Sequence, residues 1–184
     1  MDNGASSYRR FLNGDEKAFS EILDMYRDNL IFFLNRTLDN LSVAEDLAAD
    51  AFSELLFHPK RYDFRVSLKT YIFAIAHHKM VSYIRKNSRV NMLPIDDEVA
   101  KSVEYKSFEE ELLKEERKNQ CHEALNKLPE DYRTALHLLY FENMSYEEAG
   151  KVMNKNVKQI TNLAYRGRNA MKVILEQGGF IYEE

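Results

Sequence analysis

The sequence has one cysteine, no tryptophan, three prolines and six glycines among 184 residues. A lone cysteine, Cys121, excludes an internal disulfide and fits a reducing cytoplasm. Few prolines and glycines mean few turns, which favours a helical protein. No run of about 18 apolar residues is present, so no membrane-spanning helix is predicted. The first residues lack the basic and then apolar pattern of a signal peptide, so none is predicted.

The distribution of charge is more informative than its total. The net charge of -4 argues against a nucleic-acid binder. However, residues 60–89 hold 8 basic and 1 acidic residue, and residues 151–175 hold 6 basic and no acidic residue. Acidic residues outnumber basic ones by 11 to 5 in residues 1–59 and by 9 to 3 in residues 96–116. Because the local field governs attraction of a polyanion, the two basic islands indicate two separate binding surfaces.

Apolar residues recur every three or four positions in the first half of the chain. This period predicts amphipathic helices over about residues 14–38, 42–57 and 67–86. Ser42, with Glu45 three residues later, has the pattern of a capping box, so the second helix is predicted to begin at Ser42. Pro59 is predicted to end that helix.

Two of these helices carry candidate binding faces. Acidic residues line one side of the helix 42–57, which is either a solvated face or a docking face for a basic partner. Between residues 60 and 86, aromatic residues alternate with cations. Cations hold phosphates and rings stack on unpaired bases, so the mixture suits single-stranded nucleic acid. The alternative is an aromatic-rich core with a basic rim.

The C-terminal part has the pattern of a helix-turn-helix. Pro129 is predicted to occupy the first position of one helix, and Ser145 with Glu148 forms a capping box for the next. Gly150 is small where two helices must cross closely, and Asn154 suits a left-handed turn residue. The helix that follows has a buried row and a polar, basic face, which is typical of a helix that docks on duplex DNA.

Five short stretches connect these patterns to a known family. They are residues 44–52 (AEDLAADAF), 71–79 (YIFAIAHHK), 128–133 (LPEDYR), 145–150 (SYEEAG) and 165–168 (YRGR). Over nearly its whole length the chain resembles bacterial RNA polymerase sigma factors of the extracytoplasmic-function (ECF) group. The first two stretches are similar to the family's region two, and the last three to its region four.

The resemblance implies an all-α protein of two small helical domains joined by a short acidic linker. The implied divisions are a region-two domain over 1–87, a linker over 88–110, a region-four domain over 111–178 and a tail over 179–184. The implied partners are core RNA polymerase, through its clamp coiled coil and flap, and promoter DNA. An anti-sigma factor is a further partner that members of this group often have. The implied location is the cytoplasm, and no cofactor, metal site or catalytic residue is expected.

By family analogy, the acidic helix docks on the polymerase clamp through Glu45, Asp46 and Asp50. The basic-aromatic segment would capture the melted strand of the minus-ten element, with these residues near it: Lys60, Arg61, Arg65, Lys69, His77, His78 and Arg85. The helix-turn-helix would bind the minus-thirty-five duplex, with these residues near the groove or the phosphates: Tyr146, Lys155, Lys158, Gln159, Thr161, Asn162, Tyr165, Arg166 and Arg168.

The chain departs from the family pattern at several of these positions. Ala49 replaces a usual Gln, which removes one expected polymerase contact. His78 replaces a usual Asn and Ser82 a usual Asp, so the resemblance implies no base preference for the minus-ten helix. Thr161 and Leu163 replace a usual cation and a usual Arg, which shifts the groove chemistry of region four.

Two other classes of protein compete with this interpretation. A dimeric helix-turn-helix regulator explains residues 129–175 but leaves the first basic island and the acidic helix unexplained; such a regulator would bind its operator tightly without polymerase. An enzyme or metal protein would have to use His77–His78 or Cys121–His122. Adjacent residues on a helix point about 100° apart and make poor shared ligands, so this class is not favoured.

Overall fold

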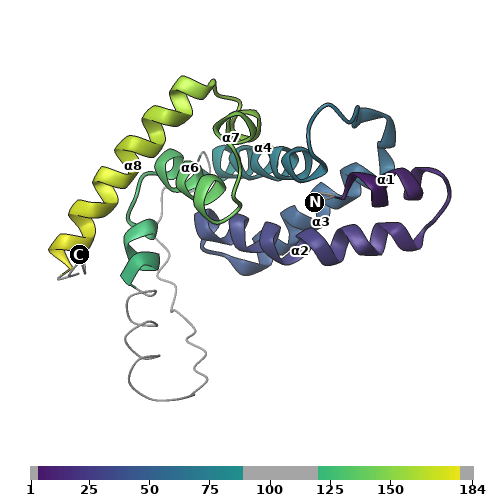
Figure 1. Ribbon diagram of the computed structural model, residues 1–184. Helices are drawn as coiled ribbons and strands as arrows, with labels where there is room; N and C mark the ends of the chain where they lie inside the picture. The colour runs from purple at the N-terminus through teal and green to yellow at the C-terminus, as the bar shows by residue number, and fades with distance from the viewer. Residues whose placement is uncertain (1–3, 89–119, 179–184) are drawn as a thin grey trace, which may run out of the picture.

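The structure is a computed structural model that describes residues 4–88 and 120–178. Every regular element in these two ranges is helical, which confirms the predicted all-α class. Residues 4–88 form an N-terminal bundle, and residues 120–178 form a C-terminal unit (Figure 1). The predicted linker from residue 89 on, the predicted start of the second domain at 111 and the tail over 179–184 lie outside the described residues.

The N-terminal bundle consists of α1 (Ala5–Leu12), α2 (Lys17–Leu38), α3 (Leu41–Phe57), the short 3₁₀ helix η1 (Pro59–Arg61) and α4 (Leu68–Ser88). The sequence did not predict α1, which is only eight residues long. Tyr8 anchors it, because the ring is fully buried and its hydroxyl donates to the carbonyl oxygen of Leu55 at 2.8 Å. The long helices α2, α3 and α4 supply the apolar faces that the period predicted.

The start of α3 differs from the prediction. Asp39 adopts a left-handed conformation (φ 49) that ends α2, and α3 begins at Leu41. The side chain of Asn40 accepts a hydrogen bond from the amide of Val43 at 3.1 Å, so Asn40 is the N-cap. The predicted capping box at Ser42 is therefore wrong. Asparagine is as good an N-cap as serine, and it stands directly after the turn that the chain needs there.

The C-terminal unit contains a helical segment over 120–126, then α6 (Glu130–Tyr140), α7 (Tyr146–Met153) and α8 (Val157–Gln177). Pro129 is the N-cap of α6 rather than its first residue. The predicted capping box of α7 is confirmed. The hydroxyl of Ser145 accepts from the amide of Glu148 at 3.2 Å, and the carboxylate of Glu148 accepts from the amide of Ser145 at 2.9 Å.

The turn between α7 and α8 has the special residues that the sequence predicted. Asn154 is left-handed, with φ 53. A Cβ atom on Gly150 would lie 2.6 Å from the carbonyl oxygen of Lys155, so only glycine fits where the turn crosses α7. A second capping box, unpredicted, begins α8: the side chain of Asn156 accepts from the amide of Gln159, and that of Gln159 accepts from the amide of Asn156.

The two units are packed against each other. One cluster of buried apolar residues runs through both, from Phe73 on α4 to Val152 on α7 and Ile160 on α8. Helix α7 lies beside α4, while α6 and α7 separate most of α8 from the bundle (Figure 1). The guanidinium of Arg133 on α6 also donates to the carbonyl oxygen of Arg36 near the end of α2 at 2.8 Å. Within the described ranges, no helix combines the length and apolar character that crossing a membrane requires.

Candidate nucleic-acid and partner surfaces

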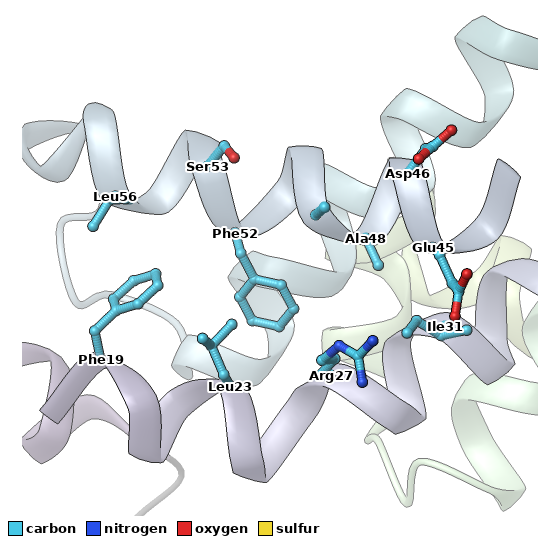
Figure 2. Close-up of a pocket in the computed structure, with 11 residues that line it drawn as sticks. Phe19, Leu23, Arg27, Ile31, Glu45, Asp46, Ala48, Phe52, Ser53 and Leu56 are labelled. Carbon is cyan, nitrogen blue, oxygen red and sulfur yellow. The ribbon is translucent and has the colours of Figure 1, made fainter. Parts of the chain in front are cut away.

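The first candidate surface is a groove between α2 and α3. It encloses about 490 Å³, and rings and aliphatic side chains such as Phe19, Leu23 and Phe52 form its floor. Glu45 and Asp46 stand at one end of it, and both carboxylates are exposed (Figure 2). An apolar groove with acids at its end suits an amphipathic helix that carries basic residues.

Asp50, the third residue predicted for this surface, does not line the groove. Its carboxylate faces α4 instead, where it lies 3.8 Å from the ammonium of Lys79 and stays largely exposed. The groove also contains residues that the sequence analysis did not select, notably Leu56 at its far end. Leucines and phenylalanines on a helical period predict burial in general, so nothing in the pattern marked these as groove residues.

The second candidate surface is a hollow beside the outer face of α4. It encloses about 530 Å³ and is lined by Glu54, Arg61, Tyr71, Ala74, Ile75, His78 and Lys79. Arg61 forms an ion pair with Glu54 across one side. His78 is exposed, and Tyr71 is half-buried with its ring at 4.9 Å from that of Tyr62. The hollow thus joins aromatic surface to cations, which are the groups that hold an unstacked base and its phosphate.

Most of the other aromatic rings near this surface belong to the core. Tyr62 and Phe73 are buried, and the hydroxyl of Tyr62 donates to the carbonyl oxygen of Val66 at 2.7 Å. Burial raises the pKa of Tyr62 and of Tyr71 above the ordinary range of a phenol, so both stay neutral. The aromatic-rich core that the sequence left as an alternative is therefore the arrangement for Tyr62 and Phe73, while Tyr71 lines the hollow.

The seven cations and histidines predicted for the minus-ten strand fall into two groups. Lys60, Arg61, Arg65, His78 and Arg85 are exposed, although Arg65 pairs with Asp63 at 3.2 Å. Lys69 and His77 instead face the C-terminal unit. Burial lowers the pKa of His77 to about 4, so its ring is neutral at physiological pH; nearby Asp131 acts in the opposite direction. The structure therefore does not gather these seven residues on one free surface.

The third candidate surface is the outward face of α8. Ile160, Ala164 and Gly167 are buried on its inner side. Lys158, Thr161, Asn162 and Arg166 are exposed on the other, together with Tyr165, which is 61% exposed. The buried row predicted for this helix is thus present, although Val157 at its first position is exposed. A free polar and basic helix face of this kind fits the major groove of duplex DNA.

The remaining predicted residues of this surface have local partners. Gln159 closes the second capping box, Lys155 pairs with Asp131 at 3.2 Å, and Arg168 donates to the hydroxyl of Tyr140 at 2.7 Å. Tyr146 is half-buried and packs against the common core. The sequence carried a signal for the role of Gln159, because Asn156 and Gln159 have the spacing of a capping box.

A polar cluster missed by sequence analysis lies where α4 meets the C-terminal unit. The ammonium of Lys69 donates to the carbonyl oxygen of Glu142 at 2.8 Å and lies 2.8 Å from its carboxylate. Nε2 of His137 lies 3.4 Å from the other carboxylate oxygen. Burial acts to raise the pKa of Glu142, but His137 and Lys69 together hold it below its ordinary value, so the buried carboxyl is charged. In sequence, Glu142 has only the features of a turn residue.

Family models match both halves of the chain. The model described as "Sigma-70 region 2" matches residues 22–90, and that described as "Sigma-70, region 4" matches residues 118–171. The ECF RNA polymerase sigma factor SigW of Bacillus subtilis is 29% identical over 86% of this chain and 89% of its own length. SigM of the same organism is 27% identical, over 86% of this chain and 95% of its own length.

Two solved structures share the fold. The sigma factor RpoE from Bartonella quintana, solved with the anti-sigma factor NepR, aligns with a TM-score of 0.71 at 23% identity, over 87% of this chain and 98% of its own. CnrH, solved with the cytosolic domain of CnrY, aligns with a TM-score of 0.65 at 18% identity, over 95% of this chain and 96% of its own.

Proposed function

The chain belongs to the extracytoplasmic-function group of RNA polymerase sigma factors, and from that premise we propose how its surfaces divide promoter recognition. As an alternative sigma factor it directs promoter-specific initiation of transcription. We assign core-polymerase binding to the α2–α3 groove, minus-ten recognition to the hollow beside α4, and minus-thirty-five recognition to α8. The observation that carries this division is that the three surfaces are separate and chemically different.

The groove is suited to a helix of the polymerase clamp. Its apolar floor would bury the apolar stripe of such a helix, and Glu45 and Asp46 would meet basic residues at one end. Asp50, which lies outside the groove, would contribute through its long-range field rather than by contact. A second polymerase element, the flap, is assigned to the C-terminal unit.

The hollow beside α4 has the size and chemistry for one unstacked base of the melted strand. Tyr71 would supply a stacking surface, and Arg61 and Lys79 would supply cations for the backbone. Taking a base out of the duplex costs a few kcal/mol, which a fitted pocket can offset. Lys60 on η1 and Arg65 on the loop that follows would extend the phosphate contacts.

The face of α8 would lie in the major groove of the minus-thirty-five duplex. Asn162 suits adenine, Arg166 suits guanine, and the methyl group of Thr161 can contact thymine. Lys155 and Arg168 are at the margins of this face and would contact phosphates. Since polymerase holds both DNA contacts of one chain, no second copy is needed to fix their spacing, and a monomer suffices.

The protein would act in the cytoplasm with core polymerase and would need no cofactor or catalytic group of its own. An anti-sigma factor is a further candidate partner, because the similar RpoE was solved with the anti-sigma factor NepR. A dimeric regulator is not favoured, because it gives no role to the groove or to the hollow beside α4.

Run-off transcription with purified core polymerase on promoter fragments tests this function. We expect specific transcripts only when the protein is added, and co-purification of the protein with core enzyme. Charge reversal at Glu45 and Asp46 should abolish both, whereas reversal of Glu123, which is exposed on the C-terminal unit, should leave both intact. Unchanged co-purification of the charge-reversed variant with core enzyme would contradict the assignment of the groove. Absence of both stimulation and co-purification with the unmodified protein would contradict the proposed function itself.

A further inference from the structure

The contact between α4 and the C-terminal unit is built around two carboxylates. Glu142 pairs with Lys69, and only 4% of the Glu142 side chain and 24% of the Lys69 side chain are exposed. One carboxylate oxygen of Glu148 lies within reach of two hydroxyls, that of Thr70 at 3.2 Å and that of Ser67 at 3.5 Å. We name these five residues the interunit clasp.

The donors of the clasp all belong to the N-terminal bundle, and the acceptors all belong to the C-terminal unit. Lysine ammonium and serine and threonine hydroxyls are common donors to DNA phosphates. Each can bind a carboxylate oxygen as readily as a phosphate oxygen, because both acceptors are anionic. Glu142 and Glu148 thus occupy three donors at the start of α4, within the basic island of residues 60–89.

Apolar packing accompanies the clasp on the same side of α4. Ile72 and Phe73 lie in the buried cluster that includes Ala149 and Val152 on α7. His77, one turn further along α4, lines a cavity with Asp131, Met153 and Lys155 of the C-terminal unit. This side of α4 is therefore covered, whereas the hollow lined by Tyr71 and His78 remains open.

We propose that the clasp is an autoinhibitory contact: without polymerase, Glu142 and Glu148 occupy phosphate-binding donors of α4, and the C-terminal unit competes with single-stranded DNA for them. This inference rests on the proposed minus-ten role of α4. Polymerase would favour the open form because it binds the two units at separate sites. Opening would expose Lys69, Ser67 and Thr70 to the strand.

The ion pair of the clasp adds little net stability to the closed arrangement, but loss of its carboxylate would leave the ammonium of Lys69 without its partner. A buried ion pair returns little net stability, because desolvation of both charges offsets most of their attraction. When only a fraction of molecules is open, the apparent affinity for a ligand of the open form falls by that same fraction. A change that opens the clasp should therefore strengthen strand binding without altering any strand contact.

The test uses the full-length double variant Glu142→Gln/Glu148→Gln. Glutamine keeps the shape of both side chains and also serves in a capping box, so α7 keeps its N-cap. The matched control is Glu123→Gln/Glu147→Gln, which makes the same change of charge at two exposed acids of the same unit. Circular dichroism and thermal melting establish that both variants are folded.

Two measurements are made on each protein. The first is a distance distribution between spin labels at Ser20→Cys on α2 and Asn169→Cys on α8, both exposed positions, in a Cys121→Ser background. The second is the affinity for a fluorescent single strand of random sequence, about twelve nucleotides long, at one low salt concentration. We expect the double variant to gain a broad long-distance population and to bind the strand about tenfold more tightly. The control should change neither.

Each other outcome overturns the inference. An unchanged distance distribution means that the two carboxylates do not hold the units together. Opening without tighter binding means that the clasp does not compete with the strand. Run-off transcription with core polymerase is measured in parallel. If the double variant initiates normally but shows either of these two results, the autoinhibitory role of the clasp is rejected and the proposed function stands. If the unmodified protein yields no specific transcripts with core polymerase, the proposed function itself is rejected.

Discussion

The two basic helices of the molecule present their charges in opposite ways. Helix α8 leaves its polar face open, with Tyr165 61% exposed and Lys158 and Arg166 on the same surface. Helix α4 turns the ammonium of Lys69 and the neutral ring of His77 toward the C-terminal unit and keeps only one side free. The comparison teaches that positive charge in a sequence predicts a binding surface only where no acid elsewhere in the chain already occupies it.

The open face of α8 depends on one glycine, which gives the largest predicted effect. In Gly150→Ala the new Cβ atom would meet the carbonyl oxygen of Lys155 at 2.6 Å, and backbone cannot yield as a flexible side chain can. We expect a loss of about 3 kcal/mol in the free energy of unfolding, measured by urea denaturation, and loss of duplex binding. Gly178→Ala, where the nearest atom is at 3.4 Å, is the control. Equal losses in both variants would contradict this explanation.

The second-largest effect is expected from charge reversal on α8, which tests whether α8 and α4 act independently. Lys158→Glu with Arg166→Glu should lower specific transcription about tenfold or more, because groove and phosphate contacts are each worth about 1–3 kcal/mol. Binding to core polymerase and the distance between the units should not change. The control is Lys172→Glu, an exposed α8 cation that pairs with Glu176. If the reversal also opened the clasp, the two helices would not be independent and the comparison would fail.

The free energy of unfolding should depend on pH through His77, which lies on the covered side of α4. The pKa of His77 is about 4 in the fold and about 6.5 in the unfolded chain, so the unfolded chain binds the proton first as pH falls. Stability is therefore full above about pH 6.5 and declines toward pH 4, by about 2 kcal/mol between pH 7 and about pH 5. Urea denaturation at both pH values measures this loss. His77→Asn should flatten the profile; an unchanged profile would contradict burial of His77 against the C-terminal unit.

The smallest predicted effect comes from a substitution outside α4 and α8. It tests whether the effects predicted above are specific to those two helices. Asn40→Ala removes the side chain that caps α3, which should cost about 1 kcal/mol in urea denaturation. Neither α4 nor α8 loses a contact in this variant, so strand binding and interunit distance should stay constant. Ser42→Ala should cost less than Asn40→Ala, because Ser42 is not the cap; the reverse order would contradict the observed start of α3.

The helix-turn-helix could be predicted closely from sequence because its determinants are local. The capping box of Ser145 and Glu148, the left-handed Asn154 and the close approach at Gly150 each depend on residues a few positions apart. The exposure of Glu45 and Asp46 was also predictable, since the amphipathic period of the helix places both outside its apolar row.

The features that escaped prediction depend on distant parts of the chain. Burial of Glu142 requires Lys69, which lies 73 positions earlier in the sequence. Helix α1 is stabilised by the burial of Tyr8 against α3 rather than by its own length. Asp50 shares a helix with Glu45 and Asp46, but α4 determines that it faces Lys79 instead of the groove. Periodicity places a residue on a face and does not say which neighbour covers that face.

The position of the Glu148 carboxylate bears on how fast the two units can separate. One of its oxygens accepts from the amide of Ser145, the N-cap of α7, and the other accepts from the hydroxyl of Thr70 in the bundle. Separation of the units would break only the second contact, so α7 would remain capped and no helix would have to unwind or reform. Release would then be a movement of folded bodies, which proteins complete in microseconds to milliseconds, and the partially unfolded states that invite proteolysis would be avoided.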